Sequence, residues 1–194
     1  MTKGIKVKKR NGRLESINLD KINKCAERAA KGIENVSSSE IVLDASIQLY
    51  DKIPTSEIDK ALIMSTRSKI EKEPNYTYVA ARMLLNNLYK EVFGETVDSD
   101  VFELQYKKNF ITNIKKLVKA GRLSPRLLEY DLKLLSEKMD IGRDLLFKYL
   151  GIQTLYDRYF IHIKQRRMEA PQAFWMRVAM GLCLNEENKT EAVL

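Results

Sequence analysis

The sequence predicts a mainly α protein: a four-helix bundle capped by a small β-hairpin or sheet, followed by the start of a second helical region. Three observations support this prediction. The first residues alternate apolar and basic side chains ahead of an Asn-Gly dipeptide, a pattern typical of a hairpin. Apolar residues then recur at helical spacing over most of the remaining chain. Capping and helix-ending residues divide this pattern into helices of ordinary length.

The predicted hairpin has two short strands joined by Asn11-Gly12. Residues 5–10 alternate apolar and basic side chains, as in a strand that is half exposed to water. Asn and Gly tolerate the positive φ angles of a tight turn. We therefore expect the second strand to run from Arg13 to Ile17.

Four helices are expected to follow the hairpin. Asn18 is a suitable N-cap for the first, and Ser37 begins a capping box for the second. Glycines at positions 32 and 94 are suited to ending the first and fourth helices. The expected ranges are 19–31, 37–50, 54–70 and 75–93.

Residues 95–100 are polar and acidic, and they are the best candidate for a domain boundary. The prediction is therefore one domain over residues 1–94 and an incomplete helical region over residues 95–194. In this second region we expect helices over 100–120, from 124 onward, over 143–156 and over 171–184, with an extended pair within 158–168. The last residues, 190–194, suit a helix but carry no terminator, so we expect a longer parent protein or a partner fragment.

Composition describes a soluble globular protein of 194 residues with a formal net charge of +8. No apolar run is long enough for a transmembrane helix, and the first residues lack the apolar core of a signal peptide. Cys25 and Cys183 lie far apart, which predicts neither a disulfide framework nor a zinc site. A cytoplasmic location is expected.

The sequence contains few groups suited to catalysis. There is no G-x-x-x-x-G-K-[ST] loop, and no G-x-G-x-x-G follows a strand. The single histidine, His162, is expected to face solvent in an extended stretch, and the two cysteines are expected to be core residues. No catalytic residue and no metal ligand are predicted.

Residues suited to bind phosphate gather around the hairpin and the helix starts. Lys9 and Arg10 lie beside the turn, and Lys21 lies in the first turn of a helix, where free backbone N–H groups favour an anion. Thr55 is a candidate cap and hydroxyl donor at another helix start. Glu15 and Asn18 are candidates to contact a ribose or a base. The residues alone leave open a second interpretation, a lysine-rich hairpin beside a well-capped helix.

The order of these residues resembles the ATP-cone, a regulatory domain at the N-terminus of many ribonucleotide reductases. The resembling stretches are 7–12, 15–22, 55–58, 74–82 and 89–90. Further along, residues 147–159 and 169–181 resemble the helical region after the cone in class I large subunits. A zinc-ribbon repressor also carries a cone, but this chain has no cysteine cluster for the ribbon. The resemblance therefore favours the reductase.

The resemblance implies a regulatory role in ribonucleoside-diphosphate reductase, an oxidoreductase of deoxyribonucleotide synthesis. ATP bound to the cone would keep the enzyme active, and dATP would change its oligomeric state and inhibit it. The effectors would be ATP and dATP, with or without Mg²⁺. The family's catalytic cysteines lie beyond this chain, which is expected to be inactive alone. Its partners would be the remaining C-terminal part of the large subunit and the radical-generating small subunit.

The resemblance also implies a nucleotide site. Phosphate contacts are expected from lysine and arginine side chains, and the sugar and base would lie against the residues that lead into the first helix. Asp59 departs from relatives that have a histidine at this point, which bears on dATP inhibition and on the number of nucleotides bound. The expected site residues are Val7, Lys9, Arg10, Glu15, Ser16, Ile17, Asn18, Leu19, Asp20, Lys21, Thr55, Ile58 and Lys90.

Two other functions are compatible with the sequence. The net charge of +8 suits a basic helical module that binds nucleic acid, although the aromatic residues fall mainly on apolar helix faces. A nucleic-acid partner is therefore not expected. No membrane partner is expected either, because the sequence has no apolar run long enough for a transmembrane helix. The chain is also compatible with a docking fragment whose cone has lost its ligand, in a natural split enzyme.

Overall fold

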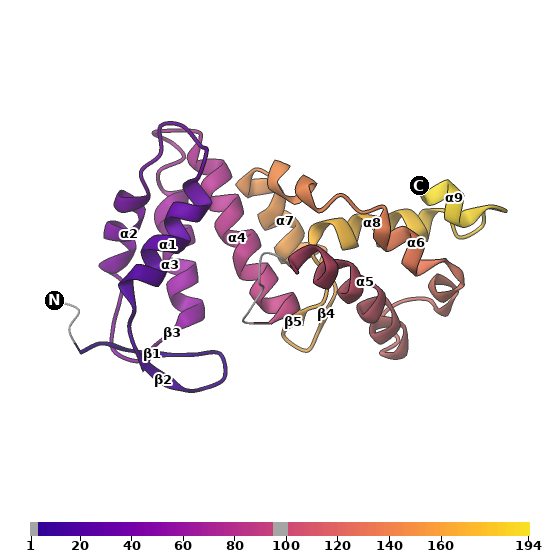
Figure 1. Ribbon diagram of the computed structural model, residues 1–194, viewed down its shortest axis with the longest axis horizontal. Helices are drawn as coiled ribbons and strands as arrows, with labels where there is room; N and C mark the ends of the chain where they lie inside the picture. The colour runs from indigo at the N-terminus through magenta and orange to yellow at the C-terminus, as the bar shows by residue number, and fades with distance from the viewer. Residues whose placement is uncertain (1–3, 95–100) are drawn as a thin grey trace. The chain divides into compact units, whose positions relative to one another are not determined.

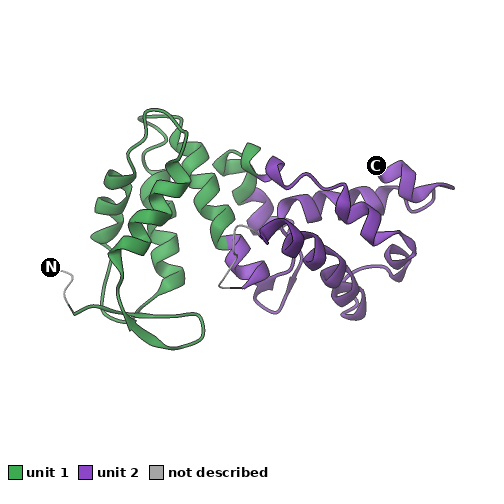
Figure 2. Cartoon of the chain, in the orientation of Figure 1, with its two compact units in different colours: residues 1–87, 145–153 green, residues 88–144, 154–194 purple. Residues whose placement is uncertain are grey.

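The computed structural model describes residues 4–94 and 101–194. The chain forms two compact units, one of Met1–Asn87 with Leu145–Gln153 and the other of Leu88–Asp144 with Thr154–Leu194 (Figure 2). Helices dominate the described residues, which confirms the predicted fold class. The boundary predicted at residues 95–100 lies outside the described residues, and the division into domains at residue 94 stays a prediction.

The first unit contains the first three predicted helices and most of the fourth, whose residues from Leu88 onward belong to the second unit (Figure 1). Helix α1 packs on α2 and α2 packs on α3, and Nη1 of Arg82 on the fourth helix donates to the carbonyl of Lys31 just after α1 (2.7 Å). Each helix contributes buried apolar side chains to the core, among them Ala26, Ile41, Leu62 and Val79. The bounds are α1 (Leu19–Ala30), α2 (Ser38–Ser46), α3 (Thr55–Arg67) and α4 (Tyr76–Phe93).

Two of these helices end earlier than predicted. The predicted ends were residue 50 for α2 and residue 70 for α3, whereas the helices end at Ser46 and Arg67. In both cases the backbone continues with tighter i→i+3 hydrogen bonds, such as the one from Leu49 N to Ser46 O (3.3 Å). The helical winding therefore continues past each α-helix as a tighter turn.

A three-stranded sheet covers part of the first unit (Figure 1). Strand β1 (Lys6–Lys8) pairs with β2 (Leu14–Ser16) in antiparallel register, which confirms the hairpin. A third strand, β3 (Ile53–Pro54), pairs with β1 in parallel, so the order is β2-β1-β3. No strand is predicted here from the sequence, because a two-residue strand ending in proline resembles the opening of a helix.

The turn of the hairpin differs from the two-residue turn that Asn11-Gly12 predicts. The N–H of Gly12 donates to the carbonyl of Lys9 (2.9 Å), and the N–H of Lys9 donates to the carbonyl of Arg13 (2.8 Å). Of the two turn residues, only Gly12 has a positive φ, +85°. This is a three-residue loop in which glycine takes the left-handed position, and it places Arg10 in the loop itself.

The second unit is built on helix α5, and its elements are short. The predicted extended pair is confirmed as a hairpin of β4 and β5. The bounds of the elements after α4 are α5 (Phe102–Lys119), η1 (Pro125–Glu129), α6 (Leu132–Glu137), η2 (Ile141–Leu146), α7 (Tyr149–Arg158), β4 (His162–Ile163), β5 (Arg166–Arg167), α8 (Pro171–Leu182) and α9 (Lys189–Val193). Of these, the end of η2 and the start of α7, residues 145–153, belong to the first unit.

Two helices predicted in this region are each divided in two. The segment opened by Ser124 is a 3₁₀ helix, and Asp131 then caps the separate helix α6 by accepting hydrogen bonds from the N–H groups of Lys133 and Leu134. The helix predicted over 143–156 is a 3₁₀ turn followed by α7. The aspartate cap gives a physical reason for the first division, since its side chain begins a new helix.

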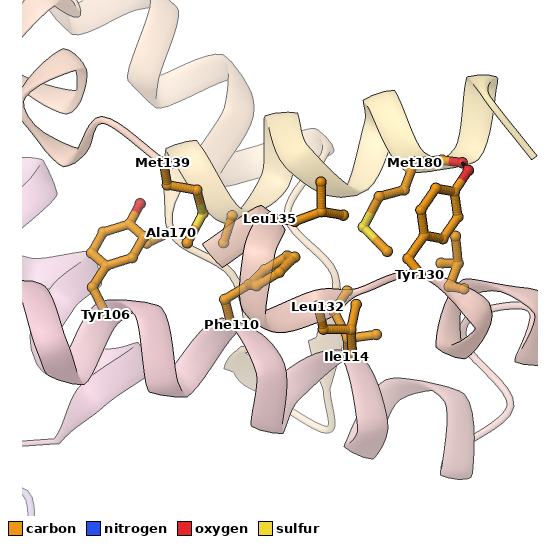
Figure 3. Close-up of a cluster of buried hydrophobic side chains, with 11 residues drawn as sticks. Tyr106, Phe110, Ile114, Tyr130, Leu132, Leu135, Met139, Ala170 and Met180 are labelled. Carbon is orange, nitrogen blue, oxygen red and sulfur yellow. Dashed lines mark hydrogen bonds between the residues drawn. The ribbon is translucent and has the colours of Figure 1, made fainter. Parts of the chain in front are cut away.

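The core of the second unit lies between α5, α6 and α8 (Figure 3). Phe110 and Ile114 on α5 face Leu135 on α6, and all three side chains are buried. The hydroxyl of Tyr130 donates to the carbonyl of Met180 (2.6 Å), which satisfies a polar group inside this cluster. None of the described helices is both long and apolar enough to span a membrane.

Candidate functional site

The predicted site residues of the first unit lie on the small sheet and on the two helices that leave it. Strand β2 leads through Ile17 and Asn18 into α1, and β3 leads directly into α3. Because β2 is antiparallel and β3 is parallel to β1, α1 begins beside Lys6 and α3 begins beside Lys8. A three-residue strand is only about 7 Å long. The two helix starts therefore lie at the two ends of one short strand.

The start of α1 agrees with the sequence prediction. Oδ1 of Asn18 accepts a hydrogen bond from the N–H of Lys21 (3.0 Å), which makes Asn18 the N-cap. Leu19, Asp20 and Lys21 form the first helical turn, and the side chains of Asp20 and Lys21 are exposed. The partial positive charge of a helix start is therefore accessible here.

The start of α3 corrects one prediction. The cap position is occupied by Pro54, and no side chain within residues 4–94 or 101–194 caps this helix, so the prediction that Thr55 is the cap is wrong. Thr55 is the first helical residue and follows the end of β3 directly. Ile58, one turn later, is buried in the core. The first N–H groups of α3 are left without a capping side chain.

The sheet brings other predicted residues side by side. Val7 lies directly opposite Glu15 on β2 and beside Ile53 on β3, so their side chains share one face of the sheet. Val7 and Ile53 are buried, whereas Glu15 is exposed at the edge. Ser16 pairs with Lys6, also at the exposed edge. Ile17 continues the pairing, because its N–H donates to the carbonyl of Ile5 (3.0 Å).

Arg10 connects the hairpin loop to two helices. Its Nη2 donates to Oδ1 of Asn87 on α4 (2.7 Å) and lies 3.7 Å from Oδ2 of Asp59 on α3. Both partners are largely buried, and the Arg10 side chain itself is only 28% exposed. The guanidinium of Arg10 is thus already compensated by a carboxylate.

The other two predicted phosphate-binding cations of this unit are not compensated in this way. The ammonium groups of Lys9 and Lys21 make no ion pair with any described residue. Lys90 lies near the end of α4, in the second unit, and it does have an interaction partner. The hairpin and α1 therefore carry positive charge that an anionic ligand would neutralise.

Other groups that the sequence analysis considered take ordinary places. His162 is exposed on β4, as predicted. The two cysteines form no disulfide with a described residue, and both are half-buried, so the prediction that they are core residues is wrong. Sγ of Cys25 accepts a hydrogen bond from Asn86 Nδ2 (3.6 Å). In the described part of the chain, no three histidine, cysteine or acidic side chains are placed to hold a metal ion.

The second unit holds two buried carboxylates that the sequence analysis did not single out. Oδ2 of Asp144 accepts hydrogen bonds from the hydroxyls of Tyr89 (2.7 Å) and Tyr106 (3.0 Å). Burial raises the pKa of Asp144 to about 6, although the two hydroxyls act in the opposite direction. Burial and the Asp144 charge also raise the pKa values of both tyrosines. No local pattern in the sequence marks this cluster.

Glu169 is the other buried carboxylate. It accepts hydrogen bonds from the N–H of Ile161 (2.6 Å) and from Nη2 of Arg177 on α8 (3.2 Å). Burial raises the pKa of Glu169, and the Arg177 guanidinium opposes this shift. Glu169 precedes α8, and Arg177 lies within this helix, eight residues later. An acidic and a basic residue at this separation do not by themselves indicate a contact, so this ion pair was not predicted from the sequence.

A cleft of about 510 Å³ lies beside the β4-β5 hairpin of the second unit. None of the predicted nucleotide-site residues lines it. Its lining includes Arg122, Tyr156, Arg158, His162 and Arg167. The guanidinium of Arg167 lies 3.4 Å from the centre of the Tyr156 ring and interacts with Glu91, so its charge is already compensated.

Comparison with known proteins identifies both parts of the chain. Residues 5–91 match the ATP cone domain family, and residues 145–194 match the ribonucleotide reductase all-alpha domain family. The ribonucleoside-diphosphate reductase alpha subunit of Chlamydia muridarum is 43% identical over 168 residues, which cover 84% of this chain and 16% of the relative. The Helicobacter pylori (strain 26695) subunit alpha is 37% identical over 193 residues, 98% of this chain and 23% of the relative.

The reductase 1 subunit alpha of Escherichia coli K12 is 30% identical over 197 aligned positions, which cover 98% of this chain and 25% of the relative. The chain thus carries an ATP-cone domain followed by part of a reductase all-alpha domain. It belongs to the ribonucleoside-diphosphate reductase alpha-subunit family and corresponds to its N-terminal region. It spans between 16% and 25% of the length of these relatives.

Proposed function

We propose that this chain is the regulatory N-terminal portion of a ribonucleoside-diphosphate reductase large subunit and that its first unit binds ATP and dATP. The observation that supports this most directly is that Lys9 and Lys21, on elements that flank one short strand, form no ion pair with any residue that the structure describes. A triphosphate is a compact polyanion, and several cations together with helix N–H groups suit it. Membership of the ATP cone family supports the same ligand.

The proposed site comprises the hairpin, the start of α1 and the start of α3. Lys9, Arg10 and Lys21 would contact phosphates. Lys90, which the resemblance also implies, belongs to the second unit and stays a prediction. Thr55 and Ile58 would complete the pocket. The remaining predicted residues would surround the sugar and base: Val7, Glu15, Ser16, Ile17, Asn18, Leu19 and Asp20.

The proposed role extends to the complete enzyme. ATP would keep the reductase active, and dATP would inhibit it by changing its oligomeric state. The rest of the large subunit would supply the chemistry of deoxyribonucleotide synthesis, and a small subunit would supply the radical. Reductase activity, measured with this chain, the complementary part and the small subunit, with and without dATP, tests this role. A docking fragment would give activity that does not respond to dATP.

Removing either uncompensated lysine should weaken nucleotide binding. We expect Lys9→Ala and Lys21→Ala each to raise the Kd for ATP about tenfold or more, because a charge-assisted hydrogen bond contributes roughly 1.5–3 kcal/mol. Isothermal titration of the 194-residue chain with ATP and dATP measures this.

Matched controls separate a specific contact from the loss of net charge. Lys8→Ala removes a charge from the neighbouring strand position, and Lys24→Ala removes one from the next turn of α1. Both should bind ATP nearly as the unmodified chain does. The proposal fails if neither nucleotide binds, or if the four variants behave alike. Competition by duplex DNA at moderate salt would instead favour the nucleic-acid alternative.

A further inference from the structure

The hairpin loop is held against the bundle by Arg10. Asn11, Gly12 and Arg13 are exposed, and Oδ1 of Asn11 accepts a local hydrogen bond from the N–H of Arg13 (3.1 Å). Arg10 instead reaches Asn87 on α4 and Asp59 on α3. The same residue therefore fixes the loop and presents a cation at the proposed site.

Arg10 differs from the two predicted phosphate-binding lysines in its ion pairing. Lys9 and Lys21 carry no ion pair with a described residue, whereas Arg10 lies 3.7 Å from a carboxylate oxygen of Asp59. The Asp59 side chain is only 13% exposed, so water screens this pair less than a surface pair. An incoming phosphate group would meet the Asp59 charge together with the Arg10 charge.

We propose that Asp59 is an internal competitor of the nucleotide phosphates for Arg10 and thereby sets the affinity of the site. In the free protein Arg10 is held by Asp59 and Asn87, and on binding the guanidinium exchanges the carboxylate of Asp59 for a phosphate group. This proposal rests on the proposed function, because it concerns the same nucleotide site. It assigns Asp59 a regulatory role without any contact to the nucleotide.

The substitution Asp59→Asn tests the competition, since it removes the charge and keeps the size of the side chain. We expect the Kd for ATP and for dATP, measured by isothermal titration, to fall about three- to tenfold. In an Arg10→Gln background the same substitution should change the Kd little, because the competed cation is gone. Circular dichroism confirms that each variant is folded.

The matched control is Asp44→Asn on α2, which removes one negative charge and one ion pair, with Lys69, from the same unit. It should leave the Kd almost unchanged. If Asp59→Asn binds ATP no more tightly than the unmodified chain, or tightens binding equally without Arg10, the competition is wrong although the nucleotide site stands. If neither the unmodified chain nor Asp59→Asn binds a nucleotide, the proposed function itself falls.

Discussion

Replacing Arg177 with methionine is expected to destabilise the second unit by about 3–5 kcal/mol, because it leaves a buried carboxylate without its counter-charge. Glu169 is only 3% exposed, and of its hydrogen bonds with described residues it would keep one, from the N–H of Ile161. Methionine retains much of the aliphatic volume of arginine, so the loss is chiefly electrostatic. The free energy of unfolding in urea measures it.

The chain offers a convenient reporter for this experiment. Trp175 is the only tryptophan, it lies on α8 two residues before Arg177, and its ring contacts Phe174. Its fluorescence therefore follows unfolding of the second unit. Arg143→Met is the matched control, since Arg143 pairs with Asp140 at the surface, where a pair contributes at most about 1 kcal/mol.

The pH dependence gives a second readout for Arg177→Met. Burial already raises the pKa of Glu169, and losing Arg177 should raise it further. A carboxyl whose pKa is raised in the folded state is most favourable when protonated, so the variant should recover stability as the pH falls. An equal loss at pH 5 and pH 8 would show that the ion pair is not the cause.

Asp144→Asn is expected to remove a pH dependence of about 3 kcal/mol from the stability of the second unit, since one pKa unit corresponds to about 1.4 kcal/mol. The ordinary pKa of this carboxyl is 3.8, and burial raises it to about 6 in the folded protein. The folded state thus binds the proton more tightly than the unfolded state. The stabilising contribution is complete below pH 3.8 and is lost as the pH rises through about 6.

The measurement compares Asp144→Asn with the unmodified chain at several pH values between 4 and about 7.5. Any packing cost of the amide is the same at each pH. The informative quantity is therefore how the difference in the free energy of unfolding between the variant and the unmodified chain changes with pH. The variant should gain relative to the unmodified chain as the pH rises. Asp140→Asn, which alters an exposed carboxylate, should show far less change, and a constant difference for Asp144→Asn would refute the prediction.

The sequence was sufficient to predict the helices of the first unit and the hairpin. Their signals are local: Asn18 and Ser37 cap helices with their own side chains, and Gly12 takes a positive φ. Strand β3 was missed because its pairing with β1 is non-local and two residues carry no strand periodicity. In the second unit, α6 was missed although Asp131 is a capping residue, since the apolar pattern around it is short.

The candidate site shows the same limit. Lys9, Lys21 and Asn18 were found because charges and caps beside a hairpin are visible in the sequence. The contact of Arg10 with Asp59 and Asn87 was not, because it joins a loop to two helices far along the chain. The buried carboxylates Asp144 and Glu169 depend on tertiary packing in the same way. The residues assigned to the nucleotide site stay predictions.

The parallel pairing of β1 with β3 has a consequence for how the first unit reaches its native state. The pairing encloses all of α1 and α2, so it closes a long stretch of chain, and such contacts are costly in entropy and form slowly. The helices, whose contacts are local, can form earlier. We therefore expect the last step of folding to be the docking of strand β1 beside β3. A ligand bound at both ends of β1 would slow the detachment of this strand from the folded unit.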